Sequence, residues 1–83
     1  IRIENLLVVE TAPALDTSDA ERDMLCWRTL TFAPVDRRLV NAAMLSAAEK
    51  DWLNAYHRQV AAKIAPQLSP AAKAWLDAAT APL

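Results

Sequence analysis

The residues whose types and spacing could do chemistry lie at the start of the chain, where Arg2 and Glu4 alternate with Ile1 and Ile3. In a strand, side chains two positions apart share a face, so the guanidinium and the carboxylate would project together. A carboxylate in this position can bind a divalent cation or form an ion pair with its neighbour. Spacing alone favours the ion pair, which on an exposed strand contributes about 0 to 1 kcal/mol to stability.

A catalytic metal centre needs more ligands than this segment holds. Such sites require several oxygen or nitrogen ligands that converge from different parts of a fold, so one carboxylate is not enough. His57 is the only histidine, and no acidic residue stands next to it in the sequence to orient it for catalysis. We therefore expect His57 to pack inside the protein or to lie on a helix surface.

Two further polar features are expected to be structural. Cys26 is the only cysteine, so an internal disulfide and a cysteine-based zinc cluster are both excluded. We expect it to be a small buried hydrophobe, and a lone thiol is consistent with a reducing cytoplasm. The run Asp36, Arg37 and Arg38 predicts a solvated turn with local ion pairs rather than an anion-binding site.

The composition is that of a small packed unit. The chain has 83 residues, of which 54% are hydrophobic, and a chain of this length buries only about 60% of its unfolded surface. It has no apolar run as long as about 18 residues, which argues against a membrane-spanning helix. A net charge of −1 without a clustered basic face argues against nucleic-acid binding. Because the chain opens with Ile1 and shows no signal peptide, we expect a fragment that begins inside a longer protein.

Two strands separated by a connection are predicted in the first half of the chain. Residues 1–10 end in an apolar run that is typical of a strand covered on both faces. Residues 11–23 are polar with little periodicity, as expected of an exposed linker. Residues 24–32 alternate again, and Pro34 ends this second strand because proline has no amide hydrogen for the ladder.

The second half is predicted to form two helices. Ser46 and Glu49 form a capping box that starts the first helix, and Pro66 ends it. Its apolar stripe recurs at three- and four-residue spacing and consists of Leu53, Tyr56, Val60 and Ile64.

The second predicted helix begins with Ser69 as N-cap and Pro70 in its first turn. Its expected buried side consists of Ala71, Trp75, Leu76 and Ala79, which places Trp75 in the core. The other two tryptophans, Trp27 and Trp52, could belong either to the core or to an interface, where aromatic residues are enriched.

Three blocks in order resemble one known family. Residues 1–5 read Ile-Arg-Ile-Glu-Asn, residues 30–39 read Leu-Thr-Phe-Ala-Pro-Val-Asp-Arg-Arg-Leu, and residues 51–57 read Asp-Trp-Leu-Asn-Ala-Tyr-His. Together they resemble the C-terminal end of an Xaa-Pro aminopeptidase (aminopeptidase P), a metal-dependent peptidase with the pita-bread fold. The resemblance implies an α+β fold. Residues 1–10 would be a late strand region of the catalytic sheet, residues 11–23 a linker, and residues 24–83 a C-terminal subdomain of one strand and two α-helices.

The resemblance also implies roles for Glu4 and Arg2. Enzymes of this family carry the last of their metal ligands as the glutamate of a Gly-x-Arg-x-Glu-Asn/Asp stretch, and residues 1–5 match it from the second position onward. Glu4 would then bridge two divalent ions, commonly manganese, and Arg2 would hold acidic groups of the site in place. The other ligands would belong to upstream segments.

For the whole protein, the resemblance implies a cytoplasmic peptidase that removes the N-terminal residue from peptides with proline in second position. The chain alone would be inactive, its partners being the remainder of the catalytic domain and a second subunit in a homodimer. The alternative is a free-standing protein–protein interaction module, in which two capped helices pack on a short hairpin and the tryptophans bind a partner. That alternative leaves the pairing of Arg2 with Glu4 unexplained.

Overall fold

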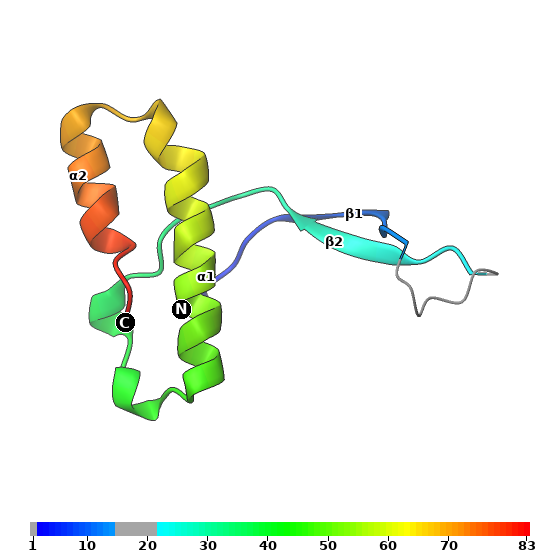
Figure 1. Cartoon of the computed structure of the whole chain (residues 1–83), viewed down its shortest axis with the longest axis horizontal. Coiled ribbons are helices and arrows are strands. Elements are labelled where there is room, and N and C mark those ends of the chain that lie inside the picture. Colours follow the sequence, from blue (N-terminus) through cyan, green and yellow to red (C-terminus); the bar gives the residue numbers. More distant parts are fainter. Residues whose placement is uncertain (1, 15–21) are drawn as a thin grey trace. The chain divides into compact units, whose positions relative to one another are not determined.

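The computed structural model describes residues 2–14 and 22–83 (Figure 1). These residues form a two-stranded antiparallel sheet followed by two α-helices, which confirms the predicted α+β class. The strands are β1 (Leu7–Thr11) and β2 (Leu25–Thr29), and the helices are α1 (Ala47–Ile64) and α2 (Pro70–Ala79). Short 3-10 turns lie at Arg37–Leu39, Ala42–Met44 and Ala65–Gln67.

The chain divides into two compact units. Ile1–Thr31 contains the hairpin and Phe32–Leu83 contains the helices. The predicted boundaries at residues 10 and 23 stay predictions. Ile1 and residues 15–21, which include much of the predicted linker, lie outside the described residues.

The hairpin is shorter than the sequence predicts. β1 and β2 pair with Val9 opposite Trp27, and the Leu6 backbone oxygen accepts a hydrogen bond from Leu30 N–H at 2.8 Å. The apolar run of β1, predicted to be covered on both faces, has its large side chains largely exposed. A two-stranded unit has no second layer, so the chain itself cannot supply that cover.

Both helices begin where the sequence predicts. Ser46 N–H donates to Glu49 Oε2 at 2.8 Å, and Glu49 N–H donates to Ser46 Oγ at 3.3 Å, so the capping box of α1 is complete. α2 begins at Pro70 after its N-cap Ser69. Figure 1 shows the two helices running in opposite directions, joined by the turn that contains Pro66.

The helical unit has a small core. Its buried side chains among the described residues are Leu53, His57 and Val60 from α1 and Leu76 from α2. The stripe predicted on α1 is confirmed in part, because Tyr56 and Ile64 are only half-buried. A core of this size leaves many large side chains of the unit at the surface.

Trp75 is not in this core, and its predicted burial is wrong. Its side chain is 64% exposed, whereas its neighbour Leu76 is almost completely buried. Neighbouring positions on an α-helix point about 100° apart, and here Leu76 rather than Trp75 is the buried side chain. Trp27 and Trp52, whose place the sequence left open, are also exposed.

Replacing Leu76 by alanine is expected to destabilise the helical unit by about 2 to 5 kcal/mol, the usual cost of removing a buried leucine side chain. Thermal unfolding of the 83-residue chain, followed by circular dichroism, measures the change. Leu39 is exposed and is the matched control. Its replacement by alanine should change the free energy of unfolding by less than about 0.5 kcal/mol. Equal effects at the two positions would contradict the core described above.

Candidate functional site

Glu4 lies in the extended segment before β1, where its Oε1 accepts a hydrogen bond from Arg2 Nη1 at 3.4 Å. The side chains are 65% exposed for Glu4 and 82% for Arg2. They share a face, as the strand spacing predicts. Because both are open to solvent, their ion pair adds little to stability, and the carboxylate remains accessible to another partner.

The described residues do not complete a metal site around Glu4. Among residues 2–14 and 22–83, no three His, Cys, Asp or Glu side chains come together in a group that could hold a metal ion. The carboxylate of Glu4 is an oxygen donor of the kind that Mg²⁺ and Mn²⁺ prefer, so its chemistry fits a divalent ion while the number of ligands does not. Glu4 can therefore bind a metal ion only together with ligands from outside the described residues.

Glu10 is a second glutamate in the same unit, but its carboxylate is already engaged. Arg28 Nε donates to Glu10 Oε2 at 2.6 Å across the hairpin. This contact is shorter than the pairing of Glu4 with Arg2, and both side chains are less exposed. Glu10 is therefore suited to hold the two strands together, and it offers a comparison for Glu4.

Cys26 lies in β2 and is half-buried, so its expected burial is only partial. Its Sγ lies 3.8 Å from the backbone oxygen of Thr11 on the facing strand. The thiol therefore makes a weak S–H hydrogen bond within the hairpin, which is consistent with the expected structural role of Cys26.

His57 is a packing histidine, as predicted. Its side chain is fully buried, and its Nε2 accepts a hydrogen bond from Val35 N–H at 3.1 Å. Its Nδ1 is buried without a hydrogen-bond partner among the described residues. Burial lowers the pKa of His57, and the positive charge of Arg37 lowers it further, so the ring is kept neutral and able to accept. Its partner stands 22 residues away, where no local sequence pattern could indicate it.

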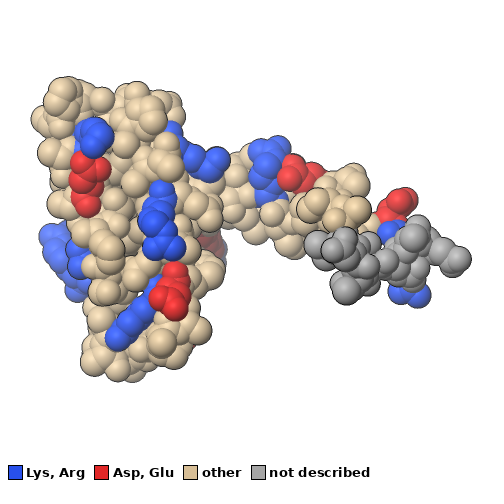
Figure 2. Space-filling view, in the orientation of Figure 1, with Lys and Arg blue, Asp and Glu red and all other residues tan. Residues whose placement is uncertain are grey.

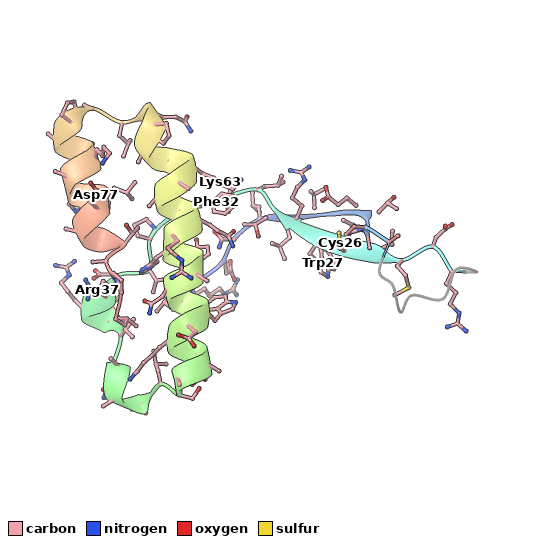
Figure 3. The ribbon with its side chains drawn as sticks, in the orientation of Figure 1. Cys26, Trp27, Phe32, Arg37, Lys63 and Asp77 are labelled. Atoms are coloured by element: carbon pink, nitrogen blue, oxygen red, sulfur yellow. The ribbon has the colours of Figure 1, made fainter. Side chains whose placement is uncertain are left out.

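Tyr56 fastens the same segment to α1. Its hydroxyl donates to the Ala33 carbonyl at 2.8 Å and accepts from Ala33 N–H at 3.3 Å. Its ring stacks on Trp52 and on Phe32, with centroids 6.0 and 6.5 Å apart. Figure 3 shows Phe32 beside Lys63, whose Nζ lies 5.0 Å from the ring centroid. The helical spacing predicted that Tyr56 packs, but not that its hydroxyl binds backbone.

The turn at Asp36 contains the predicted local ion pair. Arg38 Nη2 donates to Asp36 Oδ2 at 2.7 Å, and Arg38 N–H donates to Asp36 Oδ1 at 3.0 Å. Hydrogen bonds from the Arg38 side chain and backbone hold the pKa of Asp36 at about 2. Arg37 stands apart from this pair, and its Nη2 donates to the Pro82 carbonyl at 3.0 Å.

The sequence can now be placed among known proteins. Residues 23–83 match a family described as the "C-terminal region of peptidase_M24". The chain belongs to this family. The match covers all of the predicted C-terminal subdomain, residues 24–83, including both helices and β2.

Relatives of this M24 C-terminal region align with its whole length. A Coprinopsis cinerea protein described as "Probable Xaa-Pro aminopeptidase P" is 33% identical over 85 residues, and "Aminopeptidase P2" of Arabidopsis thaliana is 39% identical over 84 residues. Both alignments cover 100% of this chain but only 14% and 12% of the relatives' own length. The resemblance to aminopeptidase P predicted from the sequence is confirmed. No solved structure matches the chain significantly.

The charge distribution and the helices of the chain also bear on its possible partners. On the face shown in Figure 2, basic and acidic side chains lie beside one another in several small mixed groups rather than in one basic stripe. None of the helices in the described part of the chain has the length and apolarity needed to cross a membrane.

Acid is expected to destabilise the helical unit through His57. Its folded-state pKa is below its ordinary value near 6.5, so the stabilisation is complete above that value and is lost as the pH falls through the folded-state pKa. Each unit by which the pKa is lowered corresponds to a loss of about 1.4 kcal/mol. Urea unfolding of the chain at pH 8 and pH 5 measures this loss.

The control for this measurement is His57→Gln, which removes the titrating group while it retains a hydrogen-bonding side chain. The free energy of unfolding of this variant should change much less between the two pH values. Asp36, with a pKa of about 2, stays ionised throughout and does not contribute. An unchanged pH dependence in the variant would show that another group is responsible.

Proposed function

We propose that this chain is the C-terminal part of a metal-dependent aminopeptidase that hydrolyses the N-terminal Xaa-Pro bond of peptides. The observation that carries the proposal is the alignment of the whole chain, from the segment of Arg2 and Glu4 to the end of α2, with relatives described as aminopeptidases P. Since the chain spans 14% or less of those relatives, the peptidase activity would belong to the longer protein. The chain alone would be inactive.

Glu4 is the residue of this chain proposed to bind metal. Its support is the accessible carboxylate and the resemblance of residues 1–5 to the family's last ligand stretch. It would bridge two divalent ions, with manganese as the expected metal, together with ligands from the rest of the catalytic domain. When bound, such a pair of ions supplies an activated water and polarises the scissile carbonyl. The role of Glu4 is to offer its two carboxylate oxygens in a fixed direction.

Arg2 is proposed to orient that carboxylate. Its guanidinium donates to Glu4 Oε1 at 3.4 Å, a long bond that leaves the second oxygen without a contact from Arg2. Groups that hydrogen-bond to a metal ligand fix the direction of that ligand and tune its affinity for the metal. In a complete site, the positive charge of Arg2 would also balance neighbouring carboxylates.

The remainder of the chain is proposed to stabilise the enzyme. The exposed side chains of β1 suit a late strand region of a pita-bread sheet, since Val9 would be covered by neighbouring strands or helices there. Residues 24–83 would stabilise the catalytic domain and take part in a homodimer of a cytoplasmic enzyme. Exposed tryptophans support the dimer, because aromatic residues are enriched at protein interfaces.

Replacing Glu4 by alanine in the full-length protein is expected to release at least one metal ion per subunit. Activity on an Xaa-Pro peptide should fall by more than about 100-fold, because even the outer partners of metal ligands cost about 10- to 100-fold. Metal analysis by mass spectrometry and a peptide hydrolysis assay measure the two effects.

The matched control is Glu10→Ala, which removes a glutamate of the same unit whose partner is Arg28. This variant should keep its metal and most of its activity. Equal metal content in wild type and in Glu4→Ala would exclude Glu4 as a ligand. Full activity after removal of all divalent ions by a chelator would exclude the metal-dependent mechanism.

Replacing Arg2 by glutamine in the same protein is expected to weaken metal affinity by about 10- to 100-fold without abolishing binding. The measurement is activity against manganese concentration, which separates a shift in the midpoint from a loss at saturation. Activity should return at saturating manganese. A loss that excess metal does not restore would show that Arg2 acts on the substrate or on folding instead.

A further inference from the structure

The helical unit carries a surface groove with an unusual lining. Its volume is about 490 Å³, and it lies between the segment that precedes α1 and the exposed side of α2. The residues that line it are Pro34, Val35, Asp36, Arg37, Arg38, Trp75, Ala78 and Ala79. We call it the Trp75 groove. Its walls are mostly apolar, and its charged side chains are those of one acidic and two basic residues.

The two arginines of the Trp75 groove differ in their charge balance. Arg38 makes a short ion pair with Asp36, and its side chain is 89% exposed. Arg37 makes no ion pair among the described residues, and its one side-chain hydrogen bond goes to the neutral carbonyl of Pro82. Its Nε is buried and has no hydrogen-bond partner there. The groove therefore has one uncompensated positive charge.

No described acidic side chain of α2 neutralises Arg37. The acid of this helix, Asp77, accepts a hydrogen bond from Lys73 Nζ at 2.9 Å, one helical turn away. Both Asp77 and Arg37 are labelled in Figure 3. An arginine favours a carboxylate partner because its planar fork can donate two parallel hydrogen bonds. A carboxylate that pairs with Arg37 would therefore have to come from outside the described residues.

Trp75 gives the groove its apolar anchor. A tryptophan that is 64% exposed beside two alanines offers a large flat surface to another side chain. Buried tryptophan and arginine are the residue types that contribute most to binding at protein interfaces. A groove with both residues suits a polypeptide segment better than an ion alone, since an ion would leave the indole uncovered.

We propose that the Trp75 groove is the docking site for a segment of the same polypeptide, located outside this chain. That segment carries a carboxylate that pairs with Arg37 and an apolar side chain that packs on Trp75. The inference rests on the proposed function in one respect, that the chain is part of a longer enzyme. A segment on the same polypeptide has a high effective concentration, so one ion pair and one apolar contact suffice to hold it.

The test measures access to the groove in the full-length protein. Ala78→Cys places a thiol in the groove, and Ala62→Cys places one on the exposed side of α1 as a control. Maleimide labelling followed by peptide mass spectrometry separates each introduced thiol from Cys26 and from other cysteines. We expect the thiol at position 78 to react at least about tenfold more slowly than the thiol at position 62.

Charge variants then test the role of Arg37. Added to Ala78→Cys, Arg37→Gln should raise the labelling rate about tenfold, whereas Arg37→Lys, which keeps the charge, should raise it much less. Arg58→Gln on α1 is the control, since Arg58 is an exposed arginine that does not line the groove, and it should leave the rate unchanged. Circular dichroism of each variant checks that the helices remain folded.

Several outcomes would overturn the proposal. Equally fast labelling of the thiols at positions 78 and 62 would show that the groove is open. Protection that increases with protein concentration would assign it to a second copy of the chain, and protection lost on dialysis would assign it to a free small molecule. Metal content and Xaa-Pro hydrolysis are measured on the same samples. A protected groove in a protein without metal or activity would refute the proposed function and leave the docking site intact.

Discussion

The helical unit depends on one part-buried hydrogen bond, from the Val35 amide to Nε2 of His57. An imidazole that accepts at Nε2 while neutral must carry its proton on Nδ1, which here is buried without a partner. The hydrogen bond that attaches the segment around Val35 to α1 therefore leaves the Nδ1–H donor of His57 unsatisfied. Tyr56 reinforces this attachment at Ala33, so the backbone before Asp36 is held at two consecutive helix positions. That attachment is what places the arginine turn next to α2 and creates the Trp75 groove.

The same arrangement explains why the core is so small. Leu53, Val60 and Leu76 are the buried aliphatic side chains of the described residues, and the fourth buried side chain is the histidine itself. Two helices with a narrow contact have little apolar area to bury, and a unit of this length gains only a modest hydrophobic stabilisation. Large exposed side chains such as Trp52 and Trp75 are consistent with the proposal that further polypeptide covers this unit in the enzyme.

The hairpin unit also has few strong interactions among its described residues, and two of its ion pairs differ in strength. A short ion pair between Glu10 and Arg28 links the strands, whereas the pair of Glu4 and Arg2 is 3.4 Å long and exposed to solvent. Redirecting a carboxylate without a strong partner toward a cation costs little stability. This contrast between two glutamates of one unit gives the proposal for Glu4 its physical basis, and it is why Glu10 serves as the comparison.

The sequence by itself determined the features that depend on neighbouring residues. Local geometry is enough to predict that the two helices begin after the N-caps Ser46 and Ser69. It also predicts the α+β class and the shared face of Arg2 and Glu4. The resemblance to aminopeptidase P likewise required only short ordered blocks. Only the tertiary structure decided which of Trp75 and Leu76 faces inward, what Nε2 of His57 binds, and which arginine lacks a carboxylate. Those outcomes join residues 22 to 45 positions apart, and such contacts are selected by packing of the whole unit rather than by any local pattern.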